Sequence, residues 1–71
     1  MSDQRTVKIG DLEAVPSEAD RFVVRETAQD LVLGDVRIAD DGRFEARRAD
    51  GYFAGAFKTL AEAMRTLAGD R

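Results

Sequence analysis

Apolar and charged residues alternate most regularly between residues 36 and 57, and this alternation predicts two β-hairpins. Asp40-Asp41-Gly42 is typical of a short hairpin turn, with glycine at the position that favours a left-handed backbone. A turn at these residues pairs Ile38 with Phe44 and keeps the apolar side chains on one face of the sheet. A register shifted by one residue would send half of them to the opposite face.

The same register sets opposite charges against each other on the other face of this hairpin. Arg37 is expected opposite Glu45, and Asp35 opposite Arg47. Such cross-strand pairs contribute roughly 0.2–1 kcal/mol each to sheet stability. Two ion pairs between these strands are therefore predicted.

Asp50-Gly51 predicts the second hairpin, with Arg48 opposite Phe53. Gly55 has no side chain, so we expect it to let a helix approach the sheet closely. The inner face of both hairpins is then apolar or bare, and it consists of Val36, Ile38, Phe44, Ala46, Phe53, Gly55 and Phe57.

A helix is predicted directly after the second hairpin. Thr59 and Glu62 have the spacing of a capping box, with Thr59 as the N-cap residue, and Gly69 is a suitable stop. The apolar residues recur at helical spacing and form one stripe: Leu60, Ala63, Met64, Leu67 and Ala68. With Phe44, Phe53 and Phe57, this stripe is expected to form the core.

Strand formers also occur earlier in the chain, at residues 22–25 and 31–33. Leu31 and Leu33 have the opposite parity to Val36 and Ile38. A bulge at Gly34-Asp35 would return them to the inner face, and this is the interpretation we favour. Without a bulge, both leucines would project from the outer face.

These elements predict an α+β fold, in which an antiparallel meander of three to four strands carries one C-terminal helix on one face. Residues 21–71 are expected to form a single domain. Residues 1–20 are expected to be a flexible segment, or an arm that covers part of the sheet through Val7, Ile9, Leu12 and Val15. A short strand at Val7–Ile9 is a further expectation, because apolar residues flank Lys8.

Composition limits the chemistry that the protein can perform. The chain has 71 residues and contains neither cysteine nor histidine. Serine–histidine and cysteine–histidine nucleophiles are therefore absent, and zinc sites normally use these same residue types. We expect no enzymatic activity, no metal site and no cofactor. Residues 2–6 are polar, so no signal peptide is expected, and no apolar run approaches the ~20 residues of a membrane span. We therefore expect a cytoplasmic protein that does not contact a membrane. The amino-acid composition is typical of GC-rich bacteria.

Two surfaces are candidates for binding. The first is the outer face of the sheet, where arginine and tyrosine could contact an anionic ligand or a nucleic acid; its candidate residues are Arg37, Arg43, Arg47, Tyr52 and Lys58. The second is a self-association patch, which forms if Leu31 and Leu33 face outward beside the strand at residues 22–25, itself a candidate sheet edge. It would consist of Phe22, Val24, Leu31 and Leu33.

Three antiparallel strands followed by a helix, with Phe57-Lys58-Thr59-Leu60-Ala61-Glu62-Ala63 at the junction, resemble the AP2 and integrase-arm type of DNA-binding domain. The resemblance covers about residues 31–68. It implies a sheet face that enters the major groove, with Arg37, Arg43 and Arg47 at the matching positions. HicB-like antitoxin domains have a similar strand-to-helix junction.

The expected function is that of a small binding or accessory module that acts by protein–protein contact and can self-associate, for example as a homodimer. Self-association is a common way for a chain of this size to gain stability. The alternative is a small DNA-binding module of the AP2-like type that uses the outer sheet face.

Overall fold

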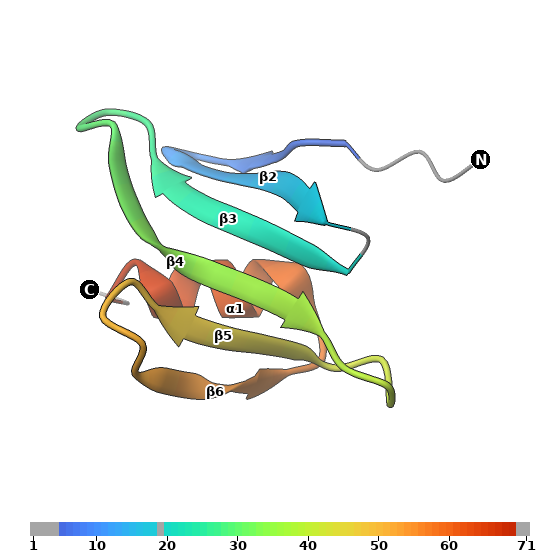
Figure 1. The fold of residues 1–71 in the computed structure, drawn as a ribbon. Coiled ribbons are helices and arrows are strands. Elements are labelled where there is room, and N and C mark those ends of the chain that lie inside the picture. Colours follow the sequence, from blue (N-terminus) through green and yellow to red (C-terminus); the bar gives the residue numbers. More distant parts are fainter. Residues whose placement is uncertain (1–4, 19, 70–71) are drawn as a thin grey trace.

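The computed structural model describes residues 5–18 and 20–69, which form one antiparallel sheet and one helix. The order of strands across the sheet follows the chain, so each strand pairs with its neighbours in sequence (Figure 1). The α+β class and the C-terminal helix are as predicted, but the sheet has six strands and not three to four. The elements are β1 (Val7–Ile9), β2 (Leu12–Glu18), β3 (Arg21–Glu26), β4 (Leu31–Ile38), β5 (Phe44–Arg48), β6 (Phe53–Phe57) and α1 (Leu60–Leu67).

The additional strands come from the N-terminal segment. The short strand expected at Val7–Ile9 is present, and it pairs with β2. β2 in turn pairs with β3 and places Ala14 opposite Val24, both fully buried. Residues 7–18 are thus part of the sheet itself, which is neither of the two arrangements expected for residues 1–20. Residues 1–4 and 19 lie outside the described part of the chain.

The β4–β5 hairpin has the predicted register. Ile38 lies opposite Phe44, and Val36 lies opposite Ala46. The Ala39 N–H donates to the Arg43 carbonyl at 2.8 Å and closes the turn. The position of Gly42 and the requirement for a single apolar face were sufficient to define this pairing.

The β5–β6 hairpin follows the prediction only in part. Ala46 lies opposite Gly55 as expected, but β6 then contains one extra residue, Ala54. Phe53 is therefore opposite Arg47 and not Arg48. The bulge moves the Phe53 ring to the outer face, where it is 48% exposed, so its predicted place in the core is wrong.

A second bulge lies in β4, one residue earlier than predicted. Val24 is opposite Gly34 and Arg25 is opposite Val32, which leaves Leu33 as the extra residue. Leu33 packs against the core, as the bulge interpretation required, whereas Leu31 is 49% exposed at the end of the strand. A Cβ atom on Gly34 would lie 2.2 Å from the Arg47 carbonyl oxygen, so only glycine fits at this crossing of β4 and β5.

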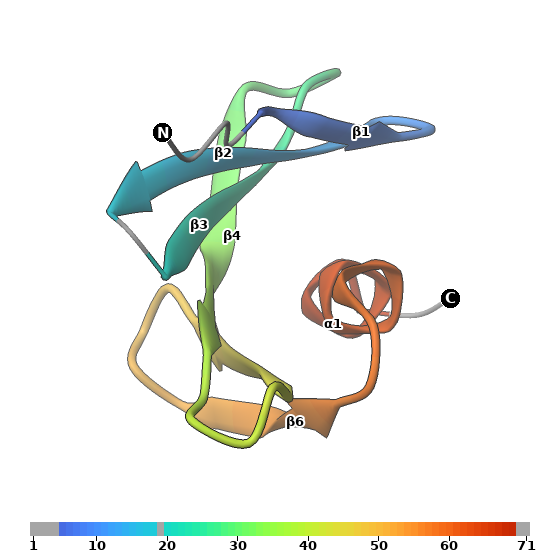
Figure 2. The same ribbon diagram turned by 90° about the vertical axis from the view of Figure 1, so that its right-hand side faces the viewer.

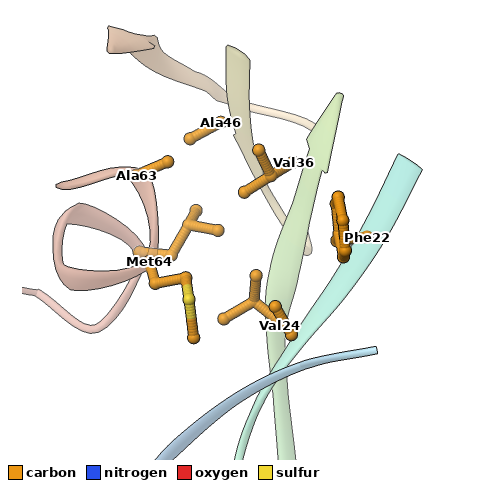
Figure 3. Packing of buried hydrophobic residues seen from close by; sticks show 8 residues of the cluster. Phe22, Val24, Val36, Ala46, Ala63 and Met64 are labelled. Atoms are coloured by element: carbon orange, nitrogen blue, oxygen red, sulfur yellow. The ribbon is translucent and has the colours of Figure 1, made fainter. Parts of the chain in front are cut away.

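The sheet curves around α1, so that β1 and β6 lie at opposite ends with the helix between them (Figure 2). Met64 extends from the helix toward Val24, and Ala63 lies opposite Ala46 (Figure 3). The core consists of Ala14, Phe22, Val24, Val36, Ala46, Ala63, Met64 and Leu67. Phe44, Phe57 and Leu60 are partly buried against it.

Phe22 and Val24 are core residues, with 8% and 0% exposure. Their predicted role in a self-association patch is therefore wrong. The reason is topological: β3 lies between β2 and β4 and is not a sheet edge.

The predicted N-cap of the helix is confirmed. The Thr59 hydroxyl accepts a hydrogen bond from the Glu62 backbone N–H at 3.2 Å. Gly55 does not serve the expected purpose, because a Cβ atom there would meet the Phe57 ring at 3.0 Å and not the helix. The missing side chain makes room for Phe57.

The clash at Gly34 generates a first prediction. Gly34→Ala should lower the free energy of unfolding by about 1–3 kcal/mol or more, because the new methyl group meets backbone and not a movable side chain. Gly10→Asn is the control, since the Gly10 turn has open space and a φ of 56° that asparagine tolerates. Urea unfolding of both variants measures the difference. Equal midpoints would contradict the packing at Gly34.

A second prediction follows from the burial of Phe22, and not Phe53, in the core. Phe22→Ala should lower the free energy of unfolding by about 3–5 kcal/mol, as expected for a buried phenylalanine. Phe53→Ala should change it by about 1 kcal/mol or less, because Phe53 is already 48% exposed. Thermal and urea unfolding distinguish the two. If Phe53→Ala lowered the free energy of unfolding more than Phe22→Ala, the outward position of Phe53 at the Ala54 bulge would be contradicted.

Candidate protein-binding surface

The outer face of the sheet contains a charged hollow of about 330 Å³. It is formed where Glu18, at the end of β2, and Asp20 come close to residues of β4 and β5. Its lining consists of Glu18, Asp20, Arg21, Asp35, Arg37, Glu45, Arg47 and Phe53. Four carboxylates and three guanidinium groups therefore face one another, so this region of the face has little net charge.

Ion pairs in this hollow do not follow the predicted partners. Arg37 and Glu45 are opposite in register, as are Asp35 and Arg47. The close contacts run toward β3 instead: Arg21 Nε donates to Asp35 Oδ2 at 2.9 Å. Arg37 Nε lies 4.0 Å from Asp20 Oδ2. All of these side chains are partly exposed, so each pair contributes about 0–1 kcal/mol to stability.

Two arginines of β5 stack on aromatic residues at the start of the next strand, namely Phe53, its first residue, and Tyr52 just before it. The Arg47 guanidinium lies 5.8 Å from the centre of the Phe53 ring, and its Nη1 donates to the Gly51 carbonyl at 3.1 Å. The Arg48 guanidinium lies 5.8 Å from the Tyr52 ring. The Ala54 bulge creates both pairs, because it shifts Phe53 and Tyr52 by one position along β5.

The predicted outer-face residues are only partly brought together. Arg37 and Arg47 both line the hollow. Arg43 instead lies 3.7 Å from Asp41 in the β4–β5 turn, Tyr52 stacks with Arg48, and Lys58 follows the end of β6. Among the arginines of the hollow, the one that the sequence interpretation missed is Arg21, which immediately precedes Phe22. The signal was available, since an inward Phe22 directs Arg21 to the outer face.

The leucines of the predicted patch belong to a different surface. Leu31 and Leu33 line a groove on the helix side of the sheet, together with Leu12 of β2 and with Arg65 and Ala68 at the end of the helix. Val32, which is 50% exposed, contributes to a shallow hollow on the opposite face. The four residues of the predicted patch therefore do not form one surface.

The free edge of β6 is a surface that the sequence interpretation did not anticipate. Phe53-Ala54-Gly55-Ala56-Phe57 contains no charge, and β6 is the last strand in the order of the sheet. The opposite edge is formed by β1, which has only three residues, one of them Lys8. Short and charged edge strands resist pairing, whereas a long uncharged edge invites it. β6 is therefore the more available edge.

Hydrogen-bond alternation determines which backbone groups of β6 are free. The Arg48 N–H donates to the Tyr52 carbonyl, so Arg48, Ala46 and Phe44 are the positions of β5 that bond toward β6. Gly55, the partner of Ala46, and Phe57, the partner of Phe44, therefore direct their backbone N–H and C=O groups toward β5. The N–H and C=O groups of Ala56 consequently point away from the sheet.

A groove runs between this edge and the helix, lined by Phe57, Glu62, Arg65 and Thr66. Glu62 and Arg65 are exposed, and neither forms an ion pair with another residue of segments 5–18 and 20–69. The Thr66 hydroxyl donates to the Glu62 carbonyl at 2.9 Å, so it is satisfied within the helix. The edge is thus flanked by one unpaired carboxylate and one unpaired guanidinium.

Within the described segments, no helix has the length and apolar character needed to cross a membrane. No group of three or more potential metal-ligating side chains occurs in the same segments. Comparison with known proteins gave no match to a family model, to a curated protein or to a solved structure.

Proposed function

We propose that the protein is a small, non-enzymatic binding module that acts by protein–protein contact, and that the free edge of β6 is its contact surface. The observation that carries this proposal is an uncharged terminal strand. Its register with β5 directs the N–H and C=O groups of Ala56 away from the sheet. An added strand would form main-chain hydrogen bonds with such an edge, and neighbouring side chains would supply selectivity. Phe53 and Tyr52, 48% and 64% exposed, lie at one end of it.

The bulge in β6 is compatible with this role. Bulges protect many sheet edges because they twist the strand away from a partner. Here the extra residue is Ala54, at the start of the strand, while Gly55 to Phe57 keep a regular register with β5. The regular half of the edge remains able to accept a strand.

The AP2-like alternative has less support from the geometry. β4, β5, β6 and α1 do follow the expected order of strands and helix. However, Asp20, Asp35 and Glu45 lie among the arginines of the outer face. Phosphate contacts supply most non-specific DNA affinity, and carboxylates in the same hollow oppose them.

The proposed contact surface can be tested with a phage-displayed library of random linear peptides. Peptides selected on the immobilised protein should bind Ala56→Pro at least about tenfold more weakly, because proline removes the outward N–H group. Ala56→Val is the matched control, since it keeps the N–H and changes only the exposed side chain. Circular dichroism checks that both variants fold. Selected peptides that bind Ala56→Pro as tightly as the wild type would place the contact elsewhere.

The alternative is tested by fluorescence anisotropy with duplex DNA at low salt. We expect no saturable binding, because the arginines of the outer face are accompanied by carboxylates. A DNA-binding module would instead show affinity that falls by roughly 0.9 log units per log unit of salt for each phosphate neutralised. If such a slope were observed and Arg47→Ala reduced it, the DNA-binding alternative would replace the proposed function.

A further inference from the structure

The direction of the free backbone groups on the β6 edge limits which kind of strand can pair with it. In the regular half of β6, from Gly55 to Phe57, the free backbone groups belong to Ala56, whose flanking residues bond toward β5. If a second β6 approached antiparallel with Ala56 opposite Ala56, each N–H would meet the carbonyl of the other. Such a pair has a two-fold axis through its centre, which is the symmetry of most dimers. The available hydrogen-bonding pattern therefore fits an identical strand.

Side chains on the inner face are compatible with the same register. Pairing about Ala56 places Gly55 opposite Phe57 of the second copy, and residues opposite each other share a face. The Phe57 ring already leans over Gly55 of its own strand, where a Cβ atom would lie 3.0 Å from the ring. The two Phe57 rings would therefore approach the two-fold axis from opposite sides. They would occupy the space that the missing side chain of Gly55 leaves in each chain. A larger residue at position 55 would close this space.

Charge complementarity extends the fit to the helix. α1 follows β6 and runs back in the opposite direction along the strand (Figure 1). The two-fold axis would therefore bring the groove beside Phe57 against its own copy, with the helices antiparallel. Glu62 of each chain would face Arg65 of the other. These are the two charged residues of the groove that form no ion pair within the described chain.

Building on the proposed function, we infer that the partner of the β6 edge is a second copy of this chain. Two chains pair antiparallel about Ala56 into one continuous sheet, and reciprocal Glu62–Arg65 ion pairs cover the junction. The inner faces of both sheets and both helices then lie on the same side. The position of the interface differs from the strand and leucine patch that the sequence suggested, because β3 is internal to the sheet.

Charge-reversal variants of the full chain test this inference by sedimentation equilibrium. Glu62→Arg places two cations in the groove, and Arg65→Glu places two anions there, so each variant should repel its own copy. Each should dissociate about tenfold more readily than the wild type, as expected for the loss of two exposed ion pairs. An equimolar mixture of the two variants should associate again, because the mixed pair restores opposite charges at both contacts.

The mixture is the decisive measurement, since a variant that merely folded poorly would not be rescued by the other. Ala56→Pro should also be monomeric, while Ala56→Val should associate like the wild type. A wild-type chain that remained monomeric at millimolar concentration would overturn the inference, as would a mixture no more associated than its components. If the wild type were monomeric but selected peptides still bound it and lost affinity for Ala56→Pro, the proposed function would stand and only the second copy would be excluded.

Discussion

Within residues 5–18 and 20–69, a single short helix has to cover the inner face of six strands, and this constraint shapes the fold. Neighbouring strands are about 4.8 Å apart and a helix is about 10 Å wide, so a flat sheet would leave most of its inner face in water. The sheet instead bends around α1 (Figure 2). Ala14, Ala46 and Ala63 are fully buried, and their small side chains allow the close approach that the bend requires. Met64 fills the remaining space beside Val24 (Figure 3).

The bend is produced where the strand pairing is irregular. Register shifts occur near Pro16, at Leu33 and at Ala54, in three of the strand pairs. Bulges increase the local twist and bend the strand that carries them. The Leu33 bulge returns the start of β4 to the core side, and Gly34 beside it allows the Arg47 carbonyl to approach. The Ala54 bulge has the opposite effect on Phe53, which leaves the core and stacks with Arg47.

Local features of the sequence were sufficient for those parts of the fold that depend on neighbouring residues. The β4–β5 turn and the Thr59 cap belong to this group, because a few side chains determine each of them. The Ala54 bulge could not be predicted in this way. The sequence pattern from Phe53 to Phe57 is the same as that expected of a strand without a bulge. The bulge turns Phe53 to the face opposite the helix, and only the assembled sheet reveals this. β2 was missed because Pro16 interrupts a weak apolar pattern, although Pro16 lies where the register already shifts.

The candidate site was predictable to a similar extent. Arg37 and Arg47 could be assigned to the outer face from strand parity alone. Their carboxylate neighbours from the β2–β3 turn could not, because that turn is distant in sequence and becomes adjacent only after β3 pairs with β4. The same pairing decides which strand is left at the edge.

Strand order therefore connects stability with binding in this chain. β2 covers the edge of β3, and β1 ends the sheet with a short strand that carries a lysine. The remaining edge, β6, is also the strand that leads directly into α1 through Lys58 and Thr59. A contact that fixes β6 would hold the N-terminus of the helix in place, and with it Met64 in the core. In a chain of 71 residues, where the stability margin is narrow, binding at this edge and folding of the core should reinforce each other.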